Sequence, residues 1–289
     1  MEISAILSDY DGTLSPTSYL DSDNETESLI YQNQNDLDRV LWEISGKRLI
    51  AIVSTKHFNF LHDRTRFANI ICCMMSIETI VLKHIQSSVC YKNNCVQKSI
   101  INTDHEILSR NYQNLVSITD KVSMKFKDVS IYRKLTYNGN LLGGITIDWR
   151  SLHDWNSIRN GIEQEVFKTI DKINTDTSEY SLFVQRYASH PFIDIYSASC
   201  SKEIAYDNIG KLIEDDSNRS NFRNGNIMYL GDSENDNPAF KKADISIGVR
   251  SDERLNPKLD CQYLINFNQL PKFLRNLLKN DFNFSERLL

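Results

Sequence analysis

The stretch Ile3-Ser-Ala-Ile-Leu-Ser-Asp-Tyr-Asp-Gly-Thr-Leu14 decides the fold. Its first half is an apolar run typical of a buried strand, and the run leads directly into Asp9 and Asp11. In an extended Asp-x-Asp segment both acidic side chains point to the same side of the chain. Gly12 permits a tight turn after them, and the Thr13 hydroxyl can fix that turn. The stretch therefore predicts a strand that ends in a pair of carboxylates.

A second acidic cluster stands far downstream, where Gly225-Asn-Ile-Met-Tyr-Leu230 leads into Gly231-Asp-Ser-Glu-Asn-Asp-Asn237. In open α/β sheets, ligands bind outside the carboxyl ends of the strands, and both clusters follow such ends. Because clustered carboxylates repel one another unless a cation lies among them, Asp9, Asp11 and Asp232 predict a metal site. Oxygen-only ligation by hard carboxylates favours Mg²⁺ over zinc.

The order of predicted elements indicates an α/β fold with a Rossmann-like, doubly wound parallel sheet. The first part of the chain reads strand 3–8, helix 29–45, strand 48–53, then a further helix and a strand at about 69–75. This βαβαβ order opens a doubly wound sheet. The same alternation of strands and helices returns late in the chain. It predicts a helix over 202–214, strands over 227–230, 245–249 and 263–265, and helices near 238 and from 271.

The middle of the chain has the pattern of antiparallel hairpins and helices. Tyr137-Asn-Gly-Asn140 stands between alternating segments, and Asn-Gly is a strong hairpin signal. The expected elements are hairpins over 89–101 and 129–149, a helix over about 151–173, and strands over 181–186 and 192–196. We therefore expect a core domain of residues 1–81 and 196–289, and an inserted α+β domain of residues 82–195.

The bulk composition restricts the class of partner. The chain has 289 residues and a net charge of −5, and its lysines and arginines are dispersed, so nothing indicates a nucleic-acid surface. No apolar run approaches the roughly 20 residues of a membrane span. The N-terminus has no basic region followed by an apolar core, so we expect a cytoplasmic protein. The sequence leaves the oligomeric state open.

The chain contains six cysteines, and none of them forms a Cys-x-x-Cys pair. In a long chain without a secretion signal, this pattern is typical of reduced thiols. Cys90 and Cys95 flank a predicted turn, which makes them the one candidate disulfide.

Four motifs, in order along nearly the whole chain, resemble those of the haloacid dehalogenase (HAD) superfamily of phosphohydrolases. Asp9-Tyr-Asp-Gly-Thr-Leu14 resembles the first motif, and Ser54, after an apolar strand, resembles the second. Lys202 before a helix resembles the third, and Gly231-Asp-Ser-Glu-Asn-Asp236 resembles the fourth. The inserted domain is similar to the C2 cap of the type IIB, Cof-like branch, which implies a domain that covers the site and selects the substrate.

The resemblance implies a catalytic role for four residues. Asp9 would be the nucleophile and a metal ligand, and Asp11 would be the general acid and base, with its backbone carbonyl also on the metal. Ser54 or its neighbour Thr55 would hydrogen-bond the phosphoryl oxygens. Lys202 would screen the charge between Asp9 and the phosphate. From the residues alone, Ser54 could instead cap the next helix, and Lys202 could be an ordinary solvated lysine.

The fourth motif supplies the remaining residues of the implied site. Asp232 would bind Mg²⁺ directly, Asp236 would bind it or orient its water molecules, and Asn235 would support the phosphate pocket. The resemblance thus implies one cofactor, Mg²⁺, and a small phosphorylated metabolite as the partner of the protein.

The substrate is implied by the inserted domain. Tyr132-Arg-Lys134 and Asp148-Trp-Arg150 are placed much like the Lys and Arg elements of trehalose-6-phosphate phosphatases, although the fourth motif lacks the Asp-Asp-x-Thr-Asp-Glu of that group. The candidate substrate contacts of this domain are Lys134, Arg150, Arg186 and His190, and for each the alternative is a surface ion pair or a satisfied hydrogen bond. A sugar phosphate similar to trehalose-6-phosphate is the expected substrate, with phosphoglycolate or another small phosphate as the alternative. A phosphomutase and a non-catalytic sugar-phosphate-binding protein are the other functions compatible with these residues.

Overall fold

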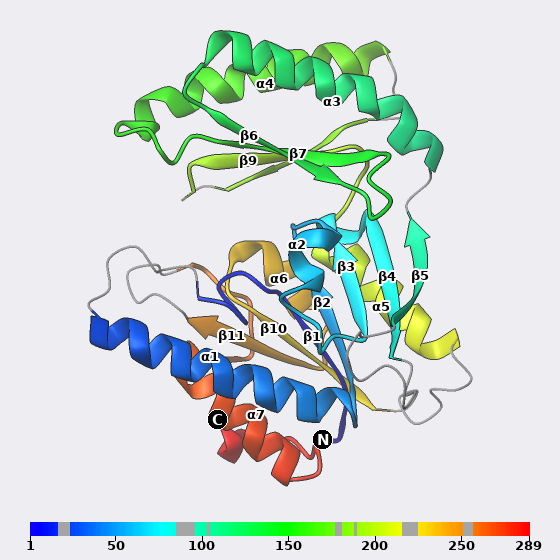
Figure 1. The fold of residues 1–289 in the computed structure, drawn as a ribbon, viewed down its shortest axis with the longest axis vertical. Coiled ribbons are helices and arrows are strands. Elements are labelled where there is room, and N and C mark those ends of the chain that lie inside the picture. The colour runs from blue at the N-terminus through cyan, green and yellow to red at the C-terminus, as the bar shows by residue number, and fades with distance from the viewer. Residues whose placement is uncertain are drawn as a thin grey trace. The chain divides into compact units, whose positions relative to one another are not determined.

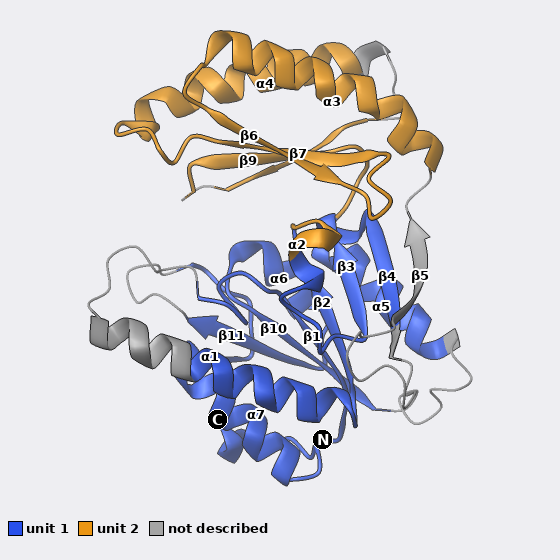
Figure 2. Cartoon of the chain, viewed as in Figure 1, with its two compact units in different colours: residues 1–55, 61–100, 201–289 blue, residues 56–60, 101–200 orange. Residues whose placement is uncertain are grey.

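The computed structural model describes residues 1–16, 24–84, 96–102, 105–176, 181–187, 190–215, 225–250 and 257–289. Contacts between residues divide the chain into two compact units (Figure 2). Unit 1 consists of residues 1–55, 61–100 and 201–289, and unit 2 consists of residues 56–60 and 101–200. Each unit has its own sheet and its own hydrophobic core.

Unit 1 is built on a mostly parallel sheet, which confirms the predicted fold class (Figure 1). Within the described residues its strands are β1 (Ile3–Ser8), β2 (Leu49–Val53), β3 (Ile70–Cys73), β4 (Glu78–His84), β5 (Val96–Asn102), β10 (Asn226–Gly231), β11 (Ile245–Arg250) and β12 (Tyr263–Asn266). They lie in the order β12-β11-β10-β1-β2-β3-β4-β5. The six strands from β12 to β3 pair in parallel, and β4 is antiparallel to β3.

Helices pack on both faces of this sheet, which explains why its strands are continuously apolar. The side of the sheet that includes Leu7 and Ala51 forms one core cluster with α5 (Lys202–Asp215) and α6 (Asn237–Phe240). On the opposite face, α1 (Asn24–Ser45) contacts β2 and packs against α7 (Leu270–Lys279) (Figure 1). The short helix α2 (Phe58–His62) follows β2. The sequence placed these helices and strands within a few residues of their observed bounds.

The two strands that follow β3 extend the larger sheet, which corrects the expected organisation. The sequence placed a hairpin over residues 89–101 in the inserted domain, but β4 and β5 belong to the sheet of unit 1. The expected boundary after residue 81 therefore falls within β4. The turn predicted at Asn93-Asn94 and the candidate disulfide Cys90–Cys95 lie outside the described residues. Alternating apolar residues indicate a strand but do not say which sheet the strand joins.

Unit 2 is an antiparallel sheet covered on one face by two helices (Figure 1). Its strands β6 (Ser130–Leu135), β7 (Leu142–Asp148), β8 (Phe183–Arg186) and β9 (Phe192–Tyr196) lie in the order β6-β7-β9-β8. β6 and β7 form the hairpin predicted at Asn138-Gly139, where Gly139 has a φ of +70°. The helix α4 (Trp155–Asp176) was predicted, whereas α3 (His105–Lys125) was missed. The buried residues of α3 recur at helical spacing, at Leu108, Leu115, Ile118 and Val122, and this spacing could have revealed it.

Four of the six cysteines lie within the described residues. Cys72, Cys73, Cys200 and Cys261 form no disulfide bonds. Within the same residues, no helix combines the length and the apolar composition that a crossing of a lipid bilayer requires.

Unit 2 depends on a close approach at Gly144 in β7. A Cβ atom at this position would lie 2.8 Å from the Ile195 carbonyl oxygen and 2.8 Å from a ring carbon of Tyr196. We therefore expect Gly144→Ala to lower the free energy of unfolding by about 1–3 kcal/mol, because the backbone of β9 has to move. A urea titration followed by circular dichroism measures this change.

The matched control for that substitution is Gly161→Ala in α4. The nearest atoms to a Cβ there belong to the Phe126 ring, 3.7 Å away, which is ordinary contact. Alanine favours a helix over glycine by about 1 kcal/mol, so this variant is expected to be at least as stable as the parent protein. Equal effects of the two substitutions would contradict the close-approach argument.

Candidate active site

Three neighbouring strands of unit 1 end in the residues singled out by the sequence. Asp9 follows β1, Ser54 follows β2 and Asp232 follows β10. Since β1 lies between β10 and β2, the carboxyl ends of these strands meet at one edge of the sheet. The Asp9 amide donates a hydrogen bond to the Leu230 carbonyl oxygen at 2.9 Å. This bond holds the first acidic cluster beside the second, which begins after Leu230.

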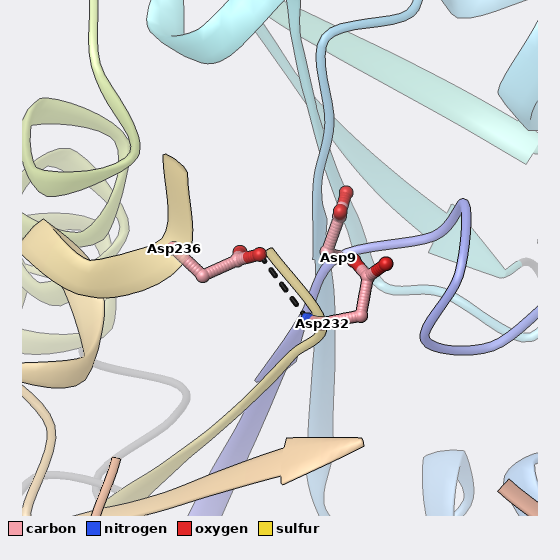
Figure 3. Close-up of side chains that lie close together, drawn as sticks. All are labelled: Asp9, Asp232 and Asp236. Atoms are coloured by element: carbon pink, nitrogen blue, oxygen red, sulfur yellow. Dashed lines mark hydrogen bonds between the residues drawn. The ribbon is translucent and has the colours of Figure 1, made fainter. Parts of the chain in front are cut away.

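Three carboxylates meet at this edge (Figure 3). Asp9, Asp232 and Asp236 each contribute one oxygen atom, and these three atoms lie within 4.8 Å of one another. Asp9 and Asp236 are buried, and Asp232 is partly buried. A compact group of carboxylate oxygens is the donor set that hard divalent cations such as Mg²⁺ prefer, so the residues present fit that ion.

The first motif reaches Asp232 through a glycine turn. Gly12 has a φ of +82°, and a Cβ atom there would lie 1.9 Å from Oδ2 of Asp232. The Thr13 hydroxyl donates to Oδ1 of the same carboxylate at 3.3 Å. The Asp-Gly-Thr sequence is therefore needed for two reasons: its glycine leaves room for Asp232, and its threonine orients that side chain.

Lys202 supplies the positive charge of the site. It is the first residue of α5 and is completely buried. Its ammonium group lies 2.6 Å from Oδ1 of Asp236 and 2.9 Å from Oδ2 of Asp9. Burial acts to lower the pKa of Lys202, but the carboxylates of Asp236 and Asp9 outweigh it and raise the pKa above its ordinary value. Lys202 is therefore a permanent cation beside Asp9 and is not a solvated surface lysine.

Two of the carboxyl groups have perturbed proton affinities. Burial is the largest effect on Asp9 and raises its pKa to about 7; the Lys202 ammonium opposes this shift and the Asp236 carboxylate adds to it. Burial also raises the pKa of Asp232 well above its ordinary value, with further contributions from the charges of Asp9 and Asp236. One buried lysine thus does not balance the negative charge of three aspartates, which is the electrostatic condition of a cation site.

Asp236 is held by hydrogen bonds to both of its oxygens. Besides Lys202, the Tyr229 hydroxyl donates to Oδ1 at 2.7 Å. Oδ2 accepts from the amide of Asp232 at 3.3 Å, and from the amide and the hydroxyl of Ser233 at 3.1 Å each (Figure 3 shows the first of these bonds). Sequence reasoning missed Tyr229, because a tyrosine in a buried strand gives no local sign of a polar partner. Asp236 orders both the lysine and the loop after β10.

The remaining candidates of unit 1 lie around this cluster. Asp11 is partly buried and directly precedes the turn at Gly12, but its carboxylate is not among the three that meet. Ser54 is completely buried, whereas Thr55 is partly exposed. The Asn235 side-chain oxygen accepts a hydrogen bond from the Ser233 hydroxyl at 2.6 Å, so Asn235 belongs to the same loop as Asp236.

In unit 2, Lys134 is enclosed by a hydrogen-bond network. Its ammonium donates to Asp194 at 2.7 Å and to the Tyr196 hydroxyl at 3.1 Å, and only 5% of the residue is exposed. Asp194 also accepts hydrogen bonds from the hydroxyl groups of Tyr187 and Thr146. Burial lowers the pKa of Lys134, although Asp194 opposes the shift. Lys134 is thus an internal partner of Asp194 in this structure.

The other candidates of unit 2 are dispersed. Arg150 is exposed and donates to Asp148 at 2.7 Å, and Arg186 is exposed and paired with Glu163 of α4. Arg186 pairs in register with Ile193, which faces the helices, whereas the neighbouring Asp194 faces the other side with Lys134. His190 is partly buried, with Tyr187 and Phe192 against its ring. The structure therefore does not bring Lys134 and Arg186 to one face of the sheet.

Comparison with known proteins rests on structure, because no family description and no curated protein matches the sequence. Solved structures that match over almost the whole chain include trehalose-6-phosphate phosphatases and a haloacid dehalogenase-like hydrolase, and the chain shares their fold. A trehalose-6-phosphate phosphatase related protein covers 96% of this chain and 98% of its own, with a TM-score of 0.57 and 16% identity.

Two further structures share this fold. The C-terminal domain of trehalose-6-phosphate phosphatase from C. albicans has a TM-score of 0.60 and 17% identity, over 96% of this chain and 93% of its own. A haloacid dehalogenase-like hydrolase from Bacteroides thetaiotaomicron has a TM-score of 0.55 and 11% identity, over 96% of this chain and 100% of its own. The expected fold of core and inserted α+β domain is therefore confirmed.

The crowded carboxylates predict how stability depends on pH. Because the pKa of Asp9 is about 7 in the folded protein and 3.8 ordinarily, its proton stabilises the folded state fully below the lower value. That contribution is lost as the pH rises through the higher value, and the raised pKa of Asp232 acts in the same direction. We therefore expect the melting temperature in EDTA to fall between about pH 5 and pH 7.5.

A divalent cation should reverse this loss, because it binds the ionised carboxylates of the folded state. Roughly 10 mM Mg²⁺ is expected to raise the melting temperature more at about pH 7.5 than at about pH 5. Differential scanning fluorimetry measures both effects. Asp232→Asn is the control, since it should remove most of the response to Mg²⁺. A response of equal size in this variant would place the cation elsewhere.

Proposed function

We propose that this protein is a Mg²⁺-dependent phosphatase that hydrolyses a phosphate monoester through an aspartyl-phosphate on Asp9. The observation that carries the proposal is the position of the Asp9 carboxylate, 2.9 Å from a buried lysine ammonium and beside Asp232 at the end of parallel strands. A carboxylate so placed can serve as a nucleophile toward a bound phosphoryl group. The fold, which is shared with phosphatases, supports the same reaction class.

The two steps of the reaction divide between Asp9 and Asp11. In the first step, a carboxylate oxygen of Asp9 bonds to phosphorus while the ester P–O bond breaks. Asp11 donates a proton to the leaving oxygen. In the second step, Asp11 takes a proton from a water molecule, whose oxygen bonds to phosphorus as the Asp9–phosphorus bond breaks. The products are the free alcohol, inorganic phosphate and the original carboxylate.

The metal site of this proposal consists of Asp9, Asp232 and the backbone carbonyl of Asp11. When bound, Mg²⁺ would neutralise negative charge on the phosphoryl group. Asp236 already accepts hydrogen bonds on both oxygens from Lys202, Tyr229 and the loop after β10, and a carboxylate offers about four lone-pair sites. We therefore assign Asp236 to holding Lys202 and the Asp232 loop, and not to the first coordination shell.

Ser54, Thr55, Asn235 and Lys202 complete the phosphate pocket in this proposal. Lys202 would screen the repulsion between the Asp9 carboxylate and the incoming phosphate, because its charge is fixed between Asp9 and Asp236. Ser54 and Thr55 stand at the end of β2, the strand next to β1, where a hydroxyl can donate to a phosphoryl oxygen.

We further propose a sugar phosphate similar to trehalose-6-phosphate as the substrate and unit 2 as the domain that selects it. The names of the matching structures support this class, and phosphoglycolate or another small phosphate is the alternative. Among the unit 2 candidates, Arg150 and His190 would be the substrate contacts, Lys134 would act through Asp194, and Arg186 would serve the helix-covered face through its pair with Glu163. The proposed site of action is the cytoplasm.

The covalent mechanism predicts the behaviour of two variants. Asp9→Asn should lower the rate of Mg²⁺-dependent phosphate release from p-nitrophenyl phosphate by at least about 10³-fold, because an amide is a poor nucleophile. Asp11→Asn should lower it by about 10²–10⁴-fold while substrate binding is retained. A malachite-green assay of released phosphate measures both rates.

Asp120→Asn, an exposed acid of α3, is the matched control and should turn over like the parent protein. Turnover that survives Asp9→Asn would overturn the aspartyl-phosphate. Release of phosphate, as opposed to its transfer to a second sugar position, distinguishes hydrolysis from a mutase reaction. The same assay with a panel of sugar phosphates and phosphoglycolate identifies the substrate class.

A further inference from the structure

The chain makes an unusual left-handed turn directly after β3. Met74, Met75 and Ser76 have φ angles of +50°, +57° and +114°, and all three are buried. Non-glycine residues seldom adopt positive φ, and three in succession are exceptional. The predicted strand, to about residue 75, is wrong at its end, because no residue of Met-Met-Ser indicates a left-handed conformation.

Packing and hydrogen bonds around this turn keep it in its strained conformation. Positive φ at a residue with a Cβ is costly, so it persists only where packing and hydrogen bonds determine it. Met74 and Met75 are 0% and 2% exposed. The turn closes with a hydrogen bond from the Ile77 amide to the Met74 carbonyl oxygen. Glycine or asparagine would relieve the strain, yet neither residue is present in the turn.

The turn changes the pairing at Ser54. The Ser54 amide donates to the Cys72 carbonyl oxygen at 3.0 Å, as in a regular continuation of the β2·β3 ladder. In such a ladder the Met74 amide would come next and donate to the Ser54 carbonyl oxygen. Instead, the Met75 amide makes this bond, at 2.9 Å. The left-handed residues thus insert one extra residue, as a β-bulge does, and bulges beside functional sites re-aim side chains.

The same turn contacts the helix of Lys202. The segment Met74–Ser76 packs against α5, which begins at Lys202. It therefore touches the two elements that carry Ser54 and Lys202, on the side of β2 away from Asp9. No other described segment between β2 and α5 contains successive residues with positive φ.

We propose that the strained turn Met74–Ser76 is a positioning device that fixes Ser54 for contact with a phosphoryl oxygen. The bond from the Met75 amide holds the Ser54 backbone at the end of β2, and packing against α5 keeps the turn from relaxing. The inference rests on the proposed function only in the role given to Ser54. Ser76 and Met75 are positioning residues that act through Ser54.

Ser76→Thr tests this inference, because a β-branched side chain resists a φ of +114° more than serine does while it keeps the hydroxyl. The melting temperature is expected to fall by about 2–5 °C. The KM for p-nitrophenyl phosphate and the inhibition constant of inorganic phosphate should both rise at least about threefold, while kcat changes less than about twofold. A merely structural turn would change the melting temperature without this split between KM and kcat.

Two further variants serve as controls. Ser76→Gly adopts a positive φ without strain, so it should keep the turn and leave KM within about twofold of the parent value. Asp281 also has a positive φ, of +48°, in an exposed turn next to α7. Asp281→Thr should lower the melting temperature and leave KM and kcat unchanged. Unchanged KM and inhibition constants in Ser76→Thr would overturn the proposal.

Hydrogen exchange of the Met75 amide tests the turn without any activity. In the parent protein with Mg²⁺, this amide should be among the slowly exchanging ones, and in Ser76→Thr it should exchange at least about tenfold faster. Fast exchange in the parent protein would overturn the inference even if Ser76→Thr failed to fold. If the parent protein released no phosphate from any ester, the proposed function would fail, while the exchange data would still decide whether the turn holds Ser54.

Discussion

The structure of the site depends on the buried ion pairs of Lys202. Its ammonium is completely enclosed and lies within 2.9 Å of Asp9 and 2.6 Å of Asp236. A buried charge without such partners costs several kcal/mol, so α5 can begin where it does only because these two carboxylates are in place. The pairing is also incomplete, because Asp232 brings a third carboxylate to the same volume. The fold thus maintains an excess of negative charge where a cation and a phosphate would meet.

The parallel topology explains how residues so distant in the sequence reach this point. β1 is hydrogen-bonded to β10 on one side and to β2 on the other, so three strand ends are adjacent although more than half of the chain separates β2 from β10. Glycines at the two acidic motifs permit the approach, since a Cβ at Gly12 would overlap Asp232 and one at Gly231 would lie 2.4 Å from the Asp236 carboxyl carbon. The sheet sets the position of each residue, and the glycines leave the room for its side chain.

Most of the fold and the centre of the site could be predicted from the sequence, because both follow local rules. Continuous apolar runs predict parallel strands, and Asp9, Asp232 and Lys202 stand at their ends or at the start of a helix. The tertiary contacts could not be predicted. Tyr229 looks like an apolar strand residue until its hydroxyl meets Asp236, and Lys134 looks like a surface cation until Asp194 encloses it. In each case the polar partner lies on a different element, in the loop after β10 or on β9. The apolar periodicity of one strand gives no information about such a partner.

Two departures from local rules lie at one edge of the larger sheet. Repelling carboxylates follow β1 and β10, and a left-handed turn of non-glycine residues follows β3. A second pair of left-handed non-glycine residues, Asp281 and Phe282, follows α7, so backbone strain alone does not distinguish this edge. What distinguishes it is that both departures adjoin the strand ends that carry Asp9 and Ser54. A sequence under selection for stability alone would place an amide at position 232, so the carboxylate cluster is the feature that stability does not explain.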